Sequence, residues 1–283
     1  VAQIGDNDSG RLFKLQVADR LDQDGLPDED ILDHGHLLST ARELLQIEPA
    51  KAGLEFPTRD TCQRLEELRT LADSVPEENR RLWRVPLPGN LGELSLHPFP
   101  HFGLAVLRSE RLFLSLRVVA YAKEYGTLAR SGWLSHTHDD NLALELWLDG
   151  RPFVTDPGSG VYTADPITRE AYRAATAHFA PRVQGASAVA PSTSPFLLPQ
   201  IGEGTLLYAA SNAFSAGLAA RLDCPPGNQG KGTVSVYRLL VLGRDSLDII
   251  DWSPDGPLIP WTNPDVTVTE GYGKTTPHPV SAL

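Results

Sequence analysis

The fold is decided by the stretch SHTHDDNLALELWLDGRPFVTDPGSG, residues 135–160. Leucine occupies every second position from 142 to 148, which is the period of a β-strand with one buried face. Residues 149–150 are Asp-Gly, the dipeptide favoured in a two-residue hairpin turn. The stretch therefore predicts an antiparallel hairpin, preceded by two histidines and followed by an aspartate.

Two further segments repeat this pattern. Residues 103–119, GLAVLRSERLFLSLRVV, predict two strands joined by a tight polar turn, and residues 233–252 predict another hairpin that bends at residues 243–245. Proline and glycine are spread between these hairpins. We therefore expect a mainly β fold, an antiparallel β-sandwich over residues 89–283.

The chain before residue 89 has a helical pattern instead. Leucines and an alanine recur at helical spacing between residues 37 and 45, and a second helix is expected from about 59 to 72, with one more short turn at 76–83. Two or three helices do not make a bundle of their own. We interpret residues 1–88 as a helical segment that ends an incomplete helical domain.

Composition narrows the class of function. A net charge of −11 argues against a nucleic-acid partner, because phosphate binding needs clustered basic residues, so an anionic ligand would require locally placed positive charge. No apolar run approaches the roughly 20 residues of a membrane-spanning helix. The chain begins with Val1 and contains no Met, so we expect a processed protein or a piece of a longer one. Cys62 and Cys224 are far apart and are interpreted as two unrelated thiols.

The candidate chemistry lies in residues 131–181. His136 and His138 are two positions apart and would point to the same side of an extended strand. Asp156 ends the second arm of the hairpin, and His178 follows a short predicted helix. Two imidazoles and one carboxylate with an open fourth position are typical of zinc, whereas Ca or Mn would require more oxygen ligands.

Other uses of the same residues remain open at this level. Asp139 and Asp140 are candidates to hold an imidazole by its other nitrogen, and His136, left over from the ligand set, is the acid/base candidate. A histidine pair on a strand is often incidental, however, and His178 alone would suit a helix end.

The stretch HTHDDNLALELWLDGRPFVTDPGSGVY followed by YRAATAH resembles the heparinase II/III family of polysaccharide lyases. The family's β-sandwich domain has a histidine-x-histidine stretch with a nearby aspartate, a later Asp-Pro-Gly and a later Ala-His. The segments IGDNDSGR (residues 4–11) and TEGYGK (residues 269–274) also resemble parts of the family, the end of its α/α toroid and its closing strand. Residues 1–88 would then be the end of that toroid.

The resemblance implies a set of roles. His138, Asp156 and His178 would be zinc ligands, and His136 would face the substrate, while Tyr162 and Arg173 are candidates to contact it. The implied reaction is β-elimination beside a uronic acid in an acidic polysaccharide, completed by a tyrosine on the toroid that nothing in this chain matches. The family's usual Asn after the last motif histidine is Phe179 here. Family habit also suggests a periplasmic or secreted protein.

Three functions follow in order of preference. The first is the metal-assisted lyase, acting on a glycosaminoglycan or an alginate-like polymer. The second is a non-catalytic carbohydrate-binding or structural sandwich in which the metal only staples loops. The third is a zinc hydrolase in which Asp139 or Asp140 acts as base. The sequence leaves the oligomeric state unspecified.

Overall fold

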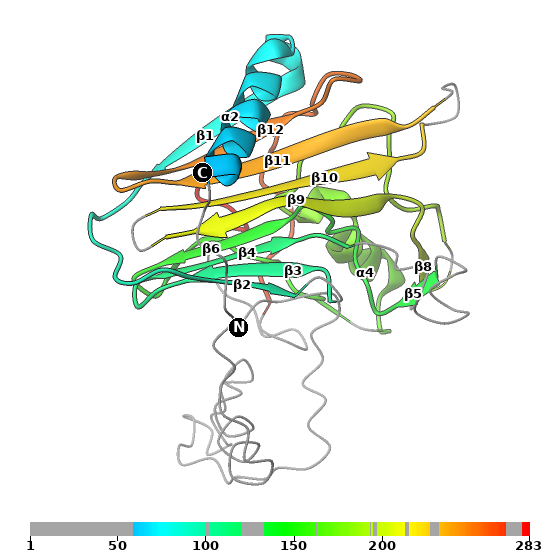
Figure 1. The fold of residues 1–283 in the computed structure, drawn as a ribbon. Coiled ribbons are helices and arrows are strands. Elements are labelled where there is room, and N and C mark those ends of the chain that lie inside the picture. Colours follow the sequence, from blue (N-terminus) through cyan, green and yellow to red (C-terminus); the bar gives the residue numbers. More distant parts are fainter. Residues whose placement is uncertain are drawn as a thin grey trace, which may run out of the picture.

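The structure is a computed structural model that describes residues 59–99, 102–119, 133–161, 163–192, 194, 197–212, 215–226, 232–269 and 279–283. Two five-stranded antiparallel sheets lie face to face as a sandwich (Figure 1). The predicted mainly β, antiparallel fold is therefore confirmed. A small two-stranded sheet lies at one end of the sandwich.

The first sheet has the strand order β1-β12-β11-β10-β9. Its strands, in sequence order, are β1 (Arg80–Pro86), β9 (Glu203–Ser211), β10 (Ala216–Cys224), β11 (Val234–Leu242) and β12 (Ser246–Trp252). The hairpin β11–β12 is the one predicted over residues 233–252. Cys224 ends β10 as a buried, free thiol, in agreement with two unrelated cysteines.

The second sheet has the order β2-β3-β4-β6-β7. Its strands are β2 (Ser95–Phe99), β3 (Leu104–Arg108), β4 (Leu112–Arg117), β6 (Leu144–Leu148) and β7 (Arg151–Val154). Asp149 and Gly150 connect β6 to β7 with φ values of 51° and 72°. Positive φ at both positions is what a type I′ hairpin turn requires, so the predicted turn is confirmed.

The core is formed where the inner faces of the two sheets meet. It contains leucines of β4 and β6 together with leucines and an isoleucine of β10, β11 and β12, all nearly inaccessible to solvent: Leu114, Leu146, Leu218, Leu240 and Ile249. Burial of such side chains stabilises a fold by about 1.5–3 kcal/mol each. This packing gives the loops at the end of the sandwich a rigid base.

One long helix covers the outer face of the first sheet (Figure 1). In this helix, α2 (Arg59–Ser74), Leu68 and Ala72 pack on side chains of β9 to β12. The helix confirms the one expected from 59 to 72, although Leu71, assigned to its buried stripe, is 51% exposed. The helix expected near residues 37–45 and the segment 4–11 lie outside the described residues.

The predicted end of the helical segment at residue 88 requires a correction. Only η1 (Glu77–Asn79) is helical in the predicted turn at 76–83, and β1 then runs from Arg80 to Pro86 as an edge strand paired with β12. Trp83 packs against the core and Val85 is buried, while Leu82 faces outward. This alternation has the period of a strand, so the sandwich begins before residue 89.

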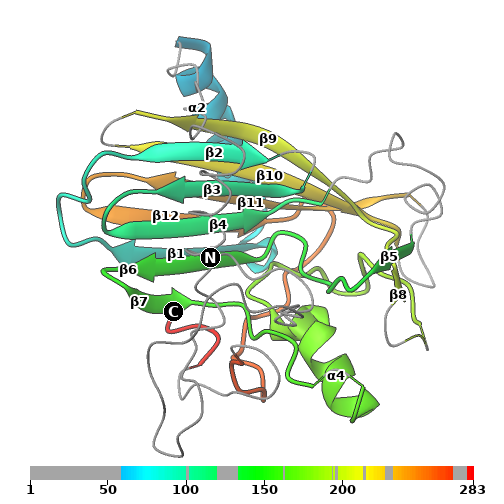
Figure 2. The ribbon, with the colours of Figure 1, turned by 90° about the horizontal axis from the view of Figure 1, so that it is seen from below.

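The remaining elements gather at one end of the sandwich (Figure 2). They are β5 (Trp133–Ser135) paired with β8 (Leu197–Pro199), the helix α4 (Pro166–Arg173) and the 3₁₀ turn η2 (Ala175–Ala177). Asp165 caps α4 by accepting hydrogen bonds from the N–H groups of residues 167 and 168, and Pro166 occupies the first turn. Within the described residues, no helix is both long and apolar enough to cross a membrane.

Candidate metal centre and its surroundings

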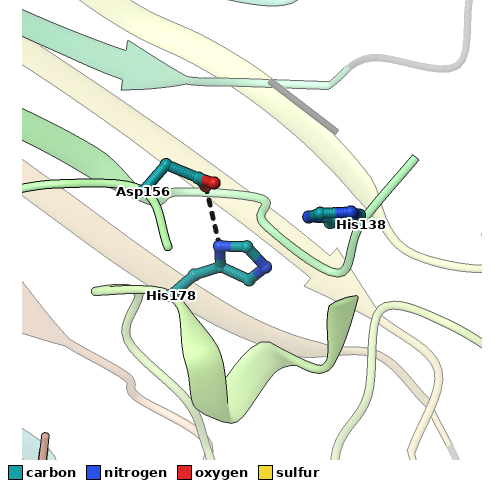
Figure 3. A group of neighbouring side chains, drawn as sticks. All are labelled: His138, Asp156 and His178. Atoms are coloured by element: carbon teal, nitrogen blue, oxygen red, sulfur yellow. Dashed lines mark hydrogen bonds and ion pairs between the residues drawn. The ribbon is translucent and has the colours of Figure 1, made fainter. Parts of the chain in front are cut away.

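Three side chains converge at this end of the sandwich from three different segments (Figure 3). His138 follows β5, Asp156 follows β7, and His178 directly follows η2. One ligand atom from each residue lies within 4.8 Å of the others. We call these residues the His-Asp-His triad. The structure thus brings together the three residues predicted to bind a metal.

The triad is buried and already internally bonded. His138, Asp156 and His178 are 2%, 7% and 1% exposed. His178 Nδ1 lies 2.9 Å from Asp156 Oδ2, and the N–H of Gly158 donates to Asp156 Oδ1 at 2.8 Å. Gly158 has a φ of 75°, which glycine adopts at no steric cost. The Asp-Pro-Gly turn therefore fixes the carboxylate toward the imidazole.

Electrostatics favour the charged form of both members of this pair. Burial favours the neutral carboxyl, but His178, its hydrogen bond and His138 outweigh burial and lower the pKa of Asp156. Burial likewise opposes a charged imidazole, but Asp156 outweighs it and raises the pKa of His178. Metal ligands must be deprotonated, so metal binding would compete with protons for these residues.

The donor set fits a metal ion. His178 Nε2 is buried and, among the described residues, has no hydrogen-bond partner. Figure 3 shows that the ring edge of His178 away from Asp156 lies on the side of His138. An unsatisfied buried nitrogen costs about 1–3 kcal/mol, and coordination to a metal would remove that cost. Two imidazoles and a carboxylate match zinc better than calcium, which requires more oxygens.

His136 does not share the orientation of His138. Its φ is 58°, in the left-handed region, so β5 ends at Ser135 and the chain turns before His138. His136 is exposed, whereas His138 is buried. The expectation that both histidines point to one side of a strand is therefore wrong. A non-glycine residue in this conformation costs about 1–3 kcal/mol, and such strain is concentrated at functional sites.

The two aspartates after His138 occupy different environments. Asp140 is 3% exposed, lies 3.5 Å from Arg117 Nε and lines a small chamber with Asp156 and His178. Asp139 lines a separate cavity, and burial raises its pKa to about 6 despite His178 nearby. Asp156, rather than either of them, bonds the second nitrogen of His178. Asp140 therefore acts on the triad through charge, across the shared chamber.

Of the two predicted substrate contacts, Arg173 and Tyr162, the structure describes only Arg173. Arg173 is 3% exposed, and its guanidinium donates to Glu170 and to the carbonyl of Ser194. Its carbonyl accepts the N–H of Asp139 at 2.9 Å. These contacts assign Arg173 to holding α4 against the site, contrary to the expected substrate contact. Tyr162 lies outside the described residues.

Arg238, which the sequence analysis missed, joins the segments that carry the triad. Its Nη1 donates to the carbonyl oxygens of Leu142 at 2.8 Å and Phe179 at 2.6 Å, just beyond His138 and His178 in sequence. A signal was available, since Arg238 interrupts an apolar strand directly opposite Asp251 in the hairpin register. Charged residues at paired inward positions indicate a buried ion pair.

Phe179 stands where the family resemblance leads us to expect an Asn, and its ring packs between other aromatic side chains. Its ring makes edge contacts with Trp83 and Trp261 at 5.3 and 5.1 Å between centroids. The guanidinium of Arg238 lies 4.9 Å from the centre of the ring. The position after His178 therefore packs the core instead of supplying a polar group.

Comparison with protein families assigns the region that holds the triad. Residues 92–213 match the family model described as Heparinase II/III-like, C-terminal. This part of the chain is therefore similar to the C-terminal domain of heparinase II/III-like proteins. The match spans His136 and all three triad residues, and it agrees with the resemblance seen in the sequence. The matched region contains the whole candidate site, whereas helix α2 and strands β1 and β10 to β12 lie outside it.

The chain resembles solved structures of heparinases only at low sequence identity and with low TM-scores. The structure of heparinase III is 20% identical, with a TM-score of 0.35, over 54% of this chain and 21% of that one. A heparan sulfate lyase, HepC, from Pedobacter heparinus is 12% identical, with a TM-score of 0.24, over 79% and 47%. The chain therefore spans between about a fifth and a half of the length of these structures. Comparison with curated proteins gave no match.

Proposed function

We propose that this chain is the C-terminal part of a polysaccharide lyase that cleaves an acidic, uronic-acid-containing glycan by β-elimination. We further propose that the His-Asp-His triad holds a zinc ion. The observation that carries the proposal is the arrangement of an exposed, strained His136 two residues before a buried triad, within the heparinase-like domain. Family and geometry support the same site.

The proposed reaction needs three contributions. A base removes the proton beside the uronate carboxylate, an acid protonates the leaving glycosidic oxygen, and positive charge neutralises the carboxylate so that the carbanion-like intermediate is accessible. His136 is assigned one of the two proton transfers, because its imidazole is exposed and histidine is the commonest general acid or base in enzymes. The other transfer is assigned to a residue outside this chain.

The zinc ion, when bound, supplies a fixed positive charge and ties three segments together. His138, Asp156 and His178 would hold it, and the Gly158 N–H keeps Asp156 oriented. Asp140, which lies 3.5 Å from Arg117, shares a chamber with Asp156 and His178, and its carboxylate favours positive charge on His178. The triad thereby fixes the loop on which His136 stands, because His138 is only two residues away.

The natural full-length protein provides the test. It would be incubated with heparan sulfate, with alginate and with neutral dextran, and unsaturated products would be followed by ultraviolet absorbance alongside new reducing ends. We expect absorbance and reducing ends to rise together on at least one acidic polymer and on dextran not at all. Reducing ends without absorbance would favour the hydrolase, and no cleavage of either acidic polymer would favour the non-catalytic module.

A further inference from the structure

A second cavity lies between the two segments that carry the triad histidines and strands β10 and β11. It measures about 180 Å³, and its lining includes Asp139, Arg182, Ser187, Cys224, Val236 and Ile259. Asp139 directly follows His138, and Arg182 comes four residues after His178. A volume of this size is that of about six water molecules. The cavity is thus tied to the candidate metal centre but is distinct from it.

Arg182 is the available positive charge in this cavity. Its side chain is partly buried, and its electrostatic partner is the Asp139 carboxylate. Within the part of the chain that the structure describes, its guanidinium forms no hydrogen bond or close ion pair. Arg117 and Arg173, by contrast, are each paired with a carboxylate. Arg182 therefore retains its capacity to bind an anion.

The cavity's chemistry restricts the ligand. A guanidinium presents a planar fork that matches a carboxylate with two hydrogen bonds. The Asp139 carboxylate accepts hydrogen bonds from hydroxyl groups, and the remaining wall is largely apolar, formed by valine, leucine, isoleucine and alanine side chains. The ligand that fits this cavity is a compact molecule with an acid group at one end, hydroxyl groups at the other and C–H faces between them.

We propose that this cavity binds a single uronic-acid unit of the glycan, with the sugar carboxylate on Arg182 and a ring hydroxyl donating to Asp139. The identity of the sugar rests on the proposed function, whereas the acid-binding cavity rests on the side chains alone. The volume lies below the roughly 300–1,000 Å³ of pockets for drug-sized ligands, which favours one sugar ring over an oligosaccharide. In a chain with a net charge of −11, an anion requires such a local positive group.

The test measures binding of free D-glucuronate to the purified chain, with D-glucose as the neutral match. A chelator is present, so that a carboxylate bound to metal does not contribute. Titration followed by nuclear magnetic resonance should show saturable glucuronate binding in the millimolar range, at least tenfold tighter than glucose. Arg182→Gln should weaken glucuronate binding at least tenfold. Arg244→Gln removes the same charge from an exposed loop and should leave binding unchanged.

A second variant guards against a folding defect in Arg182→Gln. Ala186 lines the cavity and is partly exposed, so Ala186→Phe should fill the space without a change of charge and abolish binding. Unchanged circular dichroism is the control for both variants. The proposal is overturned if wild-type protein shows no saturable binding, or if either folded variant binds glucuronate as wild type does.

The outcome is separable from the proposed function. Binding of free glucuronate requires neither metal nor catalysis. If Arg182-dependent binding is found but the full-length protein produces no unsaturated products, the binding proposal is supported and the proposed lyase function is wrong. If elimination is found while glucuronate binding is absent or independent of Arg182, the lyase stands and the cavity assignment fails.

Discussion

Arg238 and Asp251 form a two-pronged ion pair, with both nitrogen–oxygen distances 2.7 Å and with side chains that are 1% and 0% exposed. They face one another on β11 and β12. The same guanidinium holds the carbonyl oxygens of Leu142 and Phe179. The pair therefore connects strands β11 and β12 of the first sheet to both segments that carry the triad histidines.

Arg238→Met should destabilise the chain by about 3–5 kcal/mol, because it leaves the Asp251 carboxylate buried without its partner. Chemical denaturation would measure the change. The double variant Arg238→Met with Asp251→Leu should recover part of that loss, because no unpaired charge remains. Zinc affinity should stay reduced in the double variant, since the bonds to Leu142 and Phe179 are still missing. Wild-type zinc affinity there would show that Arg238 does not position the triad.

Alanine at any residue of the triad should remove the metal. His138→Ala, Asp156→Ala and His178→Ala should each lower the metal content, measured by elemental analysis, from about one zinc per chain toward zero. His97→Ala on β2 is the control and should retain a full complement. If all three triad variants kept their metal, the site would lie elsewhere.

Removal of the metal should also lower stability. A ligand that binds only the folded state at 100–1,000 times its dissociation constant stabilises it by about 3–4 kcal/mol. Chelation should therefore reduce the melting temperature of the wild-type chain and leave that of His178→Ala unchanged. Equal shifts in the two proteins would point to an effect of the chelator itself.

Asp139→Asn should change the pH dependence of stability. The folded pKa of Asp139, about 6 because of burial, lies above the ordinary unfolded value of about 3.9. The contribution of Asp139 to the free energy of unfolding is therefore fully present below about pH 4 and is lost as the pH rises through about 6. The metal-free variant should be as stable as wild type at pH 4 and more stable by about 1–3 kcal/mol at pH 8.

The exposed Asp149 provides the matched control for this pH profile. Its pKa is lowered, chiefly by the hydrogen bond from Arg111, so Asp149→Asn should lose stability above the carboxyl pKa instead of gaining it. Chemical denaturation at a series of pH values would give both profiles. Parallel profiles for the two variants would contradict the burial of Asp139.

Local signals in the sequence explain why the sandwich could be predicted. The hairpins were predicted from two local features, which are leucines at every second position and the Asp149-Gly150 turn. Both features favour strand and turn conformations without any contact from distant parts of the chain. Asp156 and His138 flank one hairpin, which explains their proximity, whereas the full set with His178 came from the family resemblance. The orientation of His136 did not follow, since its φ of 58° depends on how β5 pairs with β8 far along the chain.

Long-range packing also explains the other differences. Residues 80–86 form an edge strand because β12, more than 150 residues later, offers a pairing edge. Arg173 turned from an expected substrate contact into a packing residue because Glu170 and the Ser194 carbonyl meet its guanidinium. The cavity with Arg182 depends on strands β10 and β11, which carry no motif. These outcomes require tertiary contacts that spacing alone does not encode.

His136→Ala should separate catalysis from metal binding. The side chain is exposed and is not one of the three grouped metal-ligand candidates, so the variant should keep wild-type zinc content and stability. Removal of a residue that transfers a proton typically costs 10²–10⁴-fold in rate. We therefore expect the rate of elimination by the full-length protein to fall by at least about 100-fold, with zinc measured on the same sample. Loss of zinc in this variant would mean that the roles of His136 and His138 are exchanged, and full activity with full zinc would remove His136 from the reaction.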